Sequence, residues 1–358
     1  MVIHVAKTGN DSNDGTTYAL AKLTIANAIT TAAAGDTIYI WPGSYAEALT
    51  VNKDNLLFQG SSWGCIITSS GVGTPTITIT ANGVHFETLQ IKHTGTTVAS
   101  KDCVAIKAAD TYLMPHLKGC YVVSSDVCVW FDGDGYSVRN CILDGKEYGI
   151  YTSGIAAPKF GATIKNVLIS LSGWTVCTSS GIYLVSVGKV NLQNVQISVN
   201  VTTADGTHKC QGIGFSGLTQ AVMENVVIKT ITGNTAYEEG LSVAGGGPNL
   251  SYVSVKNFVI VQSGTSNTYS LKITASCVCA VENGRYDVSK VSGIVTQINP
   301  YLHTAVRLQK SLLAGTWRAK PGDATKQELL DVDDGATILL EQTLSETSPY
   351  RTTTVIVS

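Results

Sequence analysis

Six asparagines recur along the middle of the chain in one local sequence context, and most precede an alternating apolar stretch such as Asn166-Val-Leu-Ile. They lie between 26 and 32 residues apart: Asn140, Asn166, Asn194, Asn225, Asn257 and Asn283. A second series runs out of phase with the first, and each member opens a short strand: Gly149-Ile150, Gly181-Ile182, Gly212-Ile213 and Gly240-Leu241. Two strand-like stretches per period, repeated over several periods, predict a β-solenoid in which each period is one coil.

The asparagines have a structural interpretation. In an in-register stack, identical amides lie one strand spacing apart and can hydrogen-bond to the side chains above and below. We therefore predict an internal asparagine ladder at one turn of each coil, and not a sugar site. The apolar partners of the second series are expected to stack inside the solenoid.

Composition agrees with an all-β chain. Charged residues make up 14% of the 358 residues and hydrophobic ones 44%, with 35 glycines and 8 prolines, which suits many short strands and tight turns. At about 28 residues per period, the segment 38–298 predicts about nine or ten coils. The predicted organisation is an N-terminal cap over 1–36, the solenoid over 37–299, and a small β module for capping or association over 300–358.

The N-terminal cap is predicted to contain a helix from about Leu23 to Ala34. Its apolar residues Ile25, Ala28 and Ile29 fall on one face, and Gly35 follows as a stop signal. Because the end of a solenoid leaves unpaired strand backbone and a bare apolar core, an amphipathic helix over it is physically required.

The segment from Val5 to Glu47 carries a family resemblance. It contains Gly9-Asn-Asp-Ser-Asn-Asp-Gly-Thr16, the expected helix, Gly35-Asp-Thr-Ile-Tyr-Ile40 and Pro42-Gly-Ser-Tyr45. This region resembles the N-terminal region of pectin-lyase-like right-handed parallel β-helix proteins, and the chain is also similar to virion β-helix proteins of the phage tailspike type. One departure is Ala21-Lys-Leu-Thr-Ile, where family members commonly have Pro-Phe before Thr-Ile. The resemblance implies a right-handed parallel β-helix with carbohydrate contact along one face.

Several partner and cofactor classes are not expected. The formal net charge is −2 and no run of Lys or Arg occurs, which argues against a nucleic-acid surface. No apolar stretch is long enough to span a membrane, and no export signal is visible at the start. The nine cysteines are most simply reduced, buried core residues, with a disulfide or a metal site as the alternatives. No metal is expected, and calcium is the one cofactor left open.

Enzymes that the resemblance implies use carboxylate-bound calcium with a basic residue, or paired carboxylates. The family's catalytic signatures are absent, so no catalytic role is transferred, and a non-enzymatic role is favoured. The remaining weak catalytic candidates are Asp132, Asp134, Asp144 and Glu147, although Asp-Gly pairs are also ordinary turn formers. Asp331-Val-Asp-Asp-Gly335 resembles part of a calcium loop but lacks its other ligands, and His208 is interpreted as a loop residue.

The repeat also predicts a charged stripe. The positions before successive Gly-Ile strands carry Lys146-Glu147, Ser179-Ser180, Lys209-Cys210 and Glu238-Glu239, and we expect these side chains to lie one above another on one face. Trp174 lies near the same line. Aromatic and charged side chains together suit a sugar ring and its polar groups. The ligand-binding candidates are Glu147, Tyr148, Lys209, Tyr237, Glu238 and Glu239; solvated turn residues without a ligand are the alternative.

Two functions are consistent with these features. The first is a phage structural protein of the tailspike, fibre or capsid-decorating type, located in the virion. It would assemble as a homo-oligomer, expected to be a trimer, and would contact a host cell-surface polysaccharide or other virion proteins. The second is a secreted polysaccharide lyase or glycoside hydrolase of the pectin-lyase-like class.

Overall fold

The computed structural model forms two compact units, residues 1–296 and 297–358, which are described separately. It describes residues 1–96, 101–108, 114–132, 135–153, 161–172, 178–185, 187–201, 209–217, 220–232, 237–244, 251–263, 268–273, 277–286, 290–292, 295–298, 317–320, 323–330, 338–343 and 352–354.

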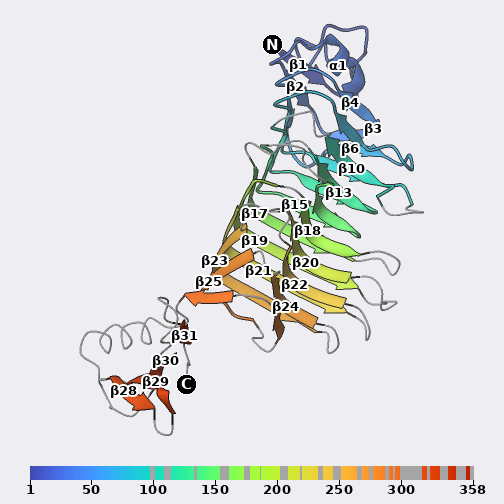
Figure 1. Ribbon diagram of the computed structural model, residues 1–358. Coiled ribbons are helices and arrows are strands. Elements are labelled where there is room, and N and C mark those ends of the chain that lie inside the picture. Colours follow the sequence, from blue (N-terminus) through green and yellow to red (C-terminus); the bar gives the residue numbers. More distant parts are fainter. Residues whose placement is uncertain are drawn as a thin grey trace. The chain divides into compact units, whose positions relative to one another are not determined.

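The first unit is a parallel β-helix, as predicted (Figure 1). One wall is a ten-stranded sheet in which each strand pairs in parallel with its counterpart in the next coil. Its strands are β4 (Leu49–Val51), β7 (Ile77–Ile79), β10 (Val104–Ala108), β13 (Val127–Phe131), β16 (Tyr148–Tyr151), β18 (Ser179–Val185), β20 (Lys209–Ser216), β22 (Tyr237–Ala244), β24 (Thr268–Ile273) and β26 (Val291–Ser292).

The remaining strands of this unit form a bent second sheet. In the early coils a turn separates two short strands, whereas later coils run through the bend as one strand. Before the bend lie β1 (Val2–Val5), β2 (Thr37–Ile40), β5 (Leu57–Gly60), β8 (His85–Glu87), β11 (His116–Lys118) and β14 (Ser137–Arg139). After it lie β3 (Gly43–Ala46), β6 (Cys65–Ser69), β9 (Gln90–His93), β12 (Tyr121–Ser124) and β15 (Ile142–Gly145). The later strands are β17 (Ala162–Leu171), β19 (Lys189–Val201), β21 (Gln220–Thr232), β23 (Ser251–Gln262), β25 (Cys277–Glu282) and β27 (Val295–Ile298).

The asparagine ladder is present, with neighbouring Nδ2 and Oδ1 atoms 2.8 to 3.3 Å apart. All six residues have φ between 51° and 54°, a left-handed conformation that asparagine tolerates better than most residues. Asparagine therefore suits both the backbone conformation of the bend and the hydrogen-bonded stack of side chains. The ladder is not internal, however, because the bend turns these side chains outward and all six are exposed.

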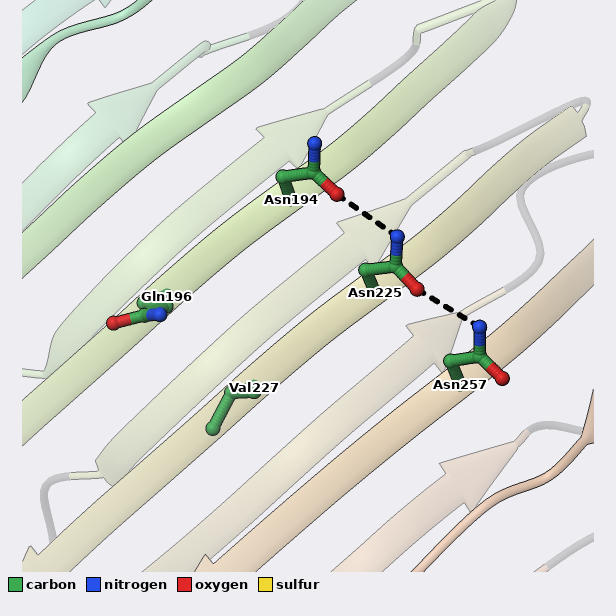
Figure 2. A pocket seen from close by; sticks show the side chains of 5 residues that line it. All are labelled: Asn194, Gln196, Asn225, Val227 and Asn257. Atoms are coloured by element: carbon green, nitrogen blue, oxygen red, sulfur yellow. Dashed lines mark hydrogen bonds between the residues drawn. The ribbon is translucent and has the colours of Figure 1, made fainter.

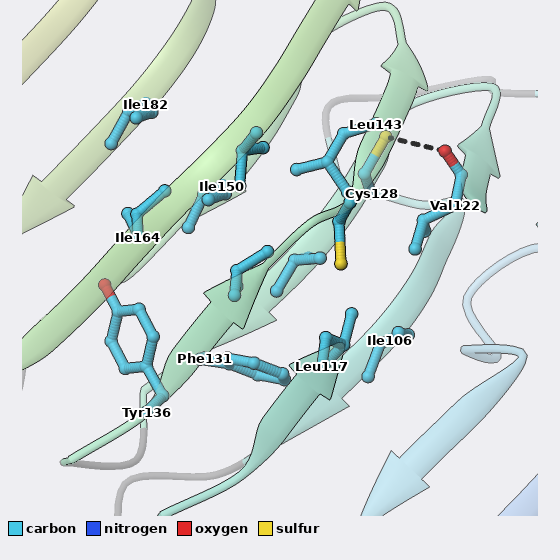
Figure 3. Close-up of a cluster of buried hydrophobic side chains, with 14 of the residues drawn as sticks. Ile106, Leu117, Val122, Cys128, Phe131, Tyr136, Leu143, Ile150, Ile164 and Ile182 are labelled. Carbon is cyan, nitrogen blue, oxygen red and sulfur yellow. Dashed lines mark hydrogen bonds between the residues drawn. The ribbon is translucent and has the colours of Figure 1, made fainter. Parts of the chain in front are cut away.

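The interior is a continuous apolar core that includes the predicted row Ile150, Ile182, Ile213 and Leu241. Figure 3 shows part of it. The glycine that precedes each member of this row is required by close packing. A Cβ on Gly212 would lie 2.3 Å from Cγ2 of Ile228 on the facing wall, and Gly181 faces Ile197 at the same distance.

The cysteines behave as small apolar residues. All eight that the described residues include are buried, and none of them forms a disulfide. Cys120 and Cys141 follow left-handed residues in adjacent coils, and their thiols are hydrogen-bonded to each other. Each occupies the position directly after the bend residue, where later coils have valine, as expected from the sequence.

The coils and the cap differ in detail from the prediction. Paired positions are only 20 residues apart between Thr37 and Leu57 but 32 apart between Glu224 and Lys256, so the coils are not uniform units of about 28. The asparagine-marked repeat covers only six turns. The early coils have shorter strands and no asparagine at the bend. The number of coils could therefore not be predicted from a single repeat length.

The cap helix is shorter than the predicted Leu23 to Ala34. Helix α1 (Ile25–Thr31) begins after Thr24, whose side chain accepts a hydrogen bond from the Asn27 amide. Glu47 accepts hydrogen bonds from two further amides of the first turn, at 2.9 and 3.0 Å. These contacts satisfy donors that have no partner within the helix. The predicted apolar face is buried over the first coils.

The second unit contains a four-stranded antiparallel sheet in the order β28 (Trp317–Lys320), β29 (Asp323–Leu330), β30 (Ile338–Thr343) and β31 (Thr352–Thr354). Its antiparallel pairing contrasts with the parallel solenoid. Among the described strands, β31 lies at the edge of this sheet. Whether this unit holds a trimer together stays a prediction.

Candidate functional site

The strand register corrects the predicted charged stripe. Tyr148 aligns with Ser180, which aligns with Gln211 and then with Glu239. The sequence pattern predicted Glu147 and Cys210 in this row, but the register places each of them one residue before it. Lys209 consequently pairs with the backbone of Tyr237.

Burial also differs from the expected solvated stripe. The side chains of the three glutamates in the candidate set, Glu147, Glu238 and Glu239, are all buried. Buried carboxylates require polar or charged partners, so each of these side chains is expected to have such partners around it.

An aromatic cluster lies on the outer side of the ten-stranded sheet and is formed by Trp130, Tyr148, Tyr151 and Tyr183. It is separate from the interior core and is supported by buried Val104 and Val127. Strand alternation explains the positions of Tyr151 and Tyr183, because Ile150 and Ile182, which directly precede them, point inward. The rings of Tyr151 and Tyr183 are stacked, with centroids 6.1 Å apart and planes at 12°. Trp130 meets Tyr151 edge-on at 5.1 Å.

Two lysines flank this aromatic cluster. The Nζ atom of Lys107 lies 3.9 Å from the centroid of the Trp130 ring, and that of Lys101 lies 5.1 Å from Tyr151 and 5.6 Å from Tyr148. These are cation–π distances. Lys101 also has φ 63°, an uncommon backbone conformation for a long side chain. The face thus combines aromatic rings with positive charge.

A buried acid pair, Asp126 and Glu147, lies beside the aromatic cluster. The backbone oxygen of Asp126 accepts a hydrogen bond from the Glu147 amide at 3.1 Å, which brings the two residues together from adjacent coils. Burial raises the pKa of Asp126 to about 9, with further contributions from the hydrogen bond to Glu147 and from its negative charge. Glu147 Oε2 also accepts a hydrogen bond from the Lys101 amide at 3.0 Å. At neutral pH the carboxyl group of Asp126 is therefore protonated.

The pair makes stability depend on pH. A carboxyl group whose pKa rises on folding takes up a proton, so its contribution to stability falls as pH rises from about 4 to about 9. We expect Asp126→Asn to remove this decline and to raise the free energy of unfolding at pH of about 8.5 by on the order of 2 kcal/mol. Urea unfolding of both proteins across this pH range measures it. Parallel pH profiles would contradict the assignment.

Asp132 fixes the rim of the aromatic cluster. Its Oδ2 accepts hydrogen bonds from Trp130 Nε1 at 2.6 Å and from Ser153 Oγ at 2.7 Å, and its Oδ1 accepts one from the Ser153 amide at 2.6 Å. This carboxylate is therefore engaged in positioning the indole. The catalytic role considered from sequence for Asp132 stays a prediction.

A second polar cluster surrounds Glu239 further along the same sheet. Glu239 Oε1 lies 3.2 Å from Nζ of Lys209 and 2.8 Å from Nζ of Lys272, and its Oε2 accepts a hydrogen bond from Gln211 at 2.8 Å. Burial raises the pKa of Glu239, but the hydrogen bond from Lys272 and the charges of both lysines outweigh it, so the pKa is lowered overall. Both lysines are part-exposed, which extends positive charge along the face.

Glu239→Gln is expected to destabilise the β-helix by about 2 kcal/mol at pH 7, because it removes a charge that satisfies two lysines. As the folded pKa is depressed, this contribution is present above the unfolded value near 4.5 and is lost as pH falls below it. The control is Glu282→Gln, which breaks the exposed pair with Lys256 and is expected to cost about 0.5 kcal/mol or less. Equal effects of the two changes in thermal unfolding would refute the assignment.

The other candidates lie elsewhere. Asp144 lies on the bent sheet and is hydrogen-bonded to the Tyr121 hydroxyl. Burial is the largest cause that raises the pKa of Tyr121, and the charge of Asp144 and this hydrogen bond raise it further. Glu238 Oε1 accepts a hydrogen bond from the Ser263 amide at 3.3 Å. The remaining candidates lie outside the described residues or have an undescribed side chain: Asp134, Trp174, His208, the side chain of Tyr237, and 331–335.

The described residues offer neither a metal-binding cluster nor a membrane-spanning helix. They contain no group of three or more histidine, cysteine or acidic residues suited to hold a metal ion. No helix in this part of the chain is long and apolar enough to cross a membrane.

Comparison with known proteins identifies the fold. No family model matches the chain, and no curated protein sequence matches it. Among solved structures, a rhamnogalacturonan lyase is similar at a TM-score of 0.56 and 14% identity, covering 94% of this chain and 96% of its own. The fold is the pectin-lyase-like parallel β-helix. An alginate lyase from Paenibacillus sp. str. FPU-7 is similar at 0.52 and 11% identity, covering 76% and 95%, and the pectin methylesterase PemA from Erwinia chrysanthemi at 0.43 and 16%, covering 68% and 90%.

The sequence did not single out Lys101, Asp126, Trp130, Tyr151 or Tyr183 as site residues. Three of them could have been found from the repeat, since Trp130, Tyr151 and Tyr183 occupy one register position in successive coils. Lys101 and Asp126 carry no periodic signal, and only the fold brings them to the aromatic cluster.

Proposed function

We propose that this protein binds an acidic polysaccharide on the outer side of its ten-stranded sheet and acts on it there. The observation that carries the proposal is the aromatic row Trp130, Tyr151 and Tyr183, flanked by Lys101 and Lys107. Aromatic rings suit the apolar face of a sugar ring, and lysines suit its carboxylates. The row spans three successive coils, so it can follow a chain of sugars rather than a single ring.

The acid pair beside the aromatic cluster favours elimination over hydrolysis. A hydrolase needs two carboxyl groups separated by about 5 Å or more, on opposite sides of the scissile bond. Asp126 and Glu147 instead share a hydrogen bond. In elimination from a uronate, a base removes a ring proton, the glycosidic C–O bond breaks as a carbon–carbon double bond forms, and an acid returns a proton to the leaving oxygen. Asp126, which carries a proton at neutral pH, can supply the proton that the leaving oxygen takes up.

A lyase of this kind is the secreted alternative considered from sequence. The virion alternative receives no support from the similar structures named above, two of which are polysaccharide lyases. The shared fold does not transfer their substrates to this chain, so the argument rests on the aromatic cluster and its lysines.

The test is binding and cleavage of polygalacturonate, a rhamnogalacturonan backbone and alginate. We expect at least one to be retarded by the protein in affinity electrophoresis, with weaker retardation at high salt because charges contribute. Cleavage would appear as ultraviolet absorbance from unsaturated sugar ends. If none of the three polymers binds at low salt, the proposal is wrong. If binding occurs without unsaturated ends, the elimination step is wrong and the binding role remains.

A further inference from the structure

A groove follows the asparagine ladder on the outer side of the bend, on a different wall from the aromatic cluster. It consists of two adjoining hollows of about 440 and 300 Å³ that share Asn194 and Gln196. Figure 2 shows the side chains of the smaller hollow, with the ladder amides in a row and Gln196 and Val227 beside them. Volumes of this size are in the usual range of small-molecule sites. The groove runs along the axis of the solenoid, across successive coils.

The lining of this groove carries no charge among the described residues. It consists of amides, apolar side chains, one thiol and one indole: Trp63, Asn140, Cys141, Ile142, Asn166, Val167, Leu168, Asn194, Gln196, Asn225, Val227 and Asn257. Two of its apolar members are exposed, Leu168 at 43% and Val227 at 37%. By contrast, lysines line the ten-stranded sheet. The two walls therefore suit ligands of different charge.

Trp63 closes one end of the larger hollow. Its indole Nε1 donates a hydrogen bond to the Gly119 oxygen at 2.5 Å, and its ring lies 6.1 Å from that of Tyr121. Although held in this way, the side chain is 44% exposed. A fixed, exposed indole at the end of a polar groove offers a flat apolar surface with little loss of side-chain freedom on binding.

The ladder amides have hydrogen-bonding capacity left for a ligand. Each amide offers two N–H groups and an oxygen with two acceptor sites. An internal member such as Asn194 donates one N–H to Asn166 and accepts one from Asn225. For the described contacts, this leaves one donor and one acceptor per coil directed to solvent, repeated at the strand spacing of about 4.8 Å. A row of paired donors and acceptors matches hydroxyl groups, which both donate and accept.

Although the sequence predicts that the ladder is not a sugar site, we propose that this groove binds an uncharged sugar chain, lying along the ladder with one ring against Trp63. The hydroxyl groups bond to the free amide positions, while Leu168 and Val227 contact the apolar edges of the rings. This site is independent of the acidic-polysaccharide site. It gives the protein a second point of attachment, of the kind that increases overall affinity for a composite glycan through effective concentration.

The test is titration calorimetry with linear oligosaccharides of glucose, mannose, xylose or galactose. We expect one of these series to bind wild type, and Trp63→Ala to weaken it about tenfold or more. The double change Asn166→Gly with Asn194→Gly keeps the left-handed backbone, since glycine accepts positive φ, and removes two amides from the groove. It is expected to weaken binding by a similar factor.

Asn283→Gly is the matched control, because it belongs to the ladder but does not line the groove. It should leave oligosaccharide binding unchanged. Binding of acidic polymers should be unchanged in all these variants, which separates this site from the aromatic cluster. Failure of every oligosaccharide to bind wild type would overturn the proposal, as would binding that both Trp63→Ala and the double asparagine variant leave intact.

Discussion

Ile213→Asp is expected to abolish folding of the β-helix. Ile213 is fully buried and pairs with Ile182 below it and Leu241 above it in the central apolar row. An aspartate there would be a buried charge without a partner, which costs several kcal/mol. Total stabilities of domains are about 5–15 kcal/mol, so one such change removes much of the margin. Circular dichroism and the soluble fraction after expression measure the effect.

Val222→Asp is the matched control for this change. Val222 is also in a parallel strand but is 44% exposed, so the new carboxylate stays in water. Its melting temperature should be close to that of wild type. A soluble Ile213→Asp protein with an unchanged melting temperature would show that the central row is not interior.

The second large effect is expected from Tyr151→Ala combined with Tyr183→Ala. These rings form the stacked centre of the aromatic cluster, and Lys101 lies over the first of them. Loss of a binding hot spot typically costs about 2 kcal/mol, which is roughly a thirty-fold loss of affinity. We therefore expect binding of the acidic polysaccharide to fall by about this factor, measured by titration calorimetry.

Tyr252→Ala provides the comparison, because this tyrosine is 41% exposed on the bent sheet, away from the aromatic cluster. It should bind like wild type. Both proteins should keep the wild-type circular dichroism spectrum, since the interior is untouched. Equal affinity of the double variant and wild type would remove the aromatic cluster from the binding site.

The fold was largely predictable because its determinants are local and repeated. The asparagine marks the bend, since few residues accept its positive φ, and the Gly-Ile pair marks the strand that packs closely on the facing wall. Where these markers are absent, as in the early coils, the sequence period could not show how many residues one coil takes. The predicted helix lies where α1 is found but is longer than α1. Helix propensity alone could not show that Thr24 and Glu47 bind the amides of the first turn and so determine where the helix begins.

The candidate residues from the sequence lie near the proposed site but do not define it. The sequence pointed to Glu147, Tyr148, Lys209 and Glu239, and all four lie on or beside the outer side of the ten-stranded sheet. A slip of one residue in the alignment hid which side chains stack, since neighbouring positions of a strand face opposite sides. The burial of the glutamates could not be foreseen either, because it depends on partners such as Asp126, 21 residues earlier in the chain.

The most direct test of the central claim is a structure of the protein with an oligosaccharide from an acidic polymer that it binds. The account predicts sugar rings against Trp130, Tyr151 and Tyr183, with carboxylates directed to Lys101 or Lys107. Sugar density confined to another wall at saturating ligand, with the aromatic cluster empty, would contradict it.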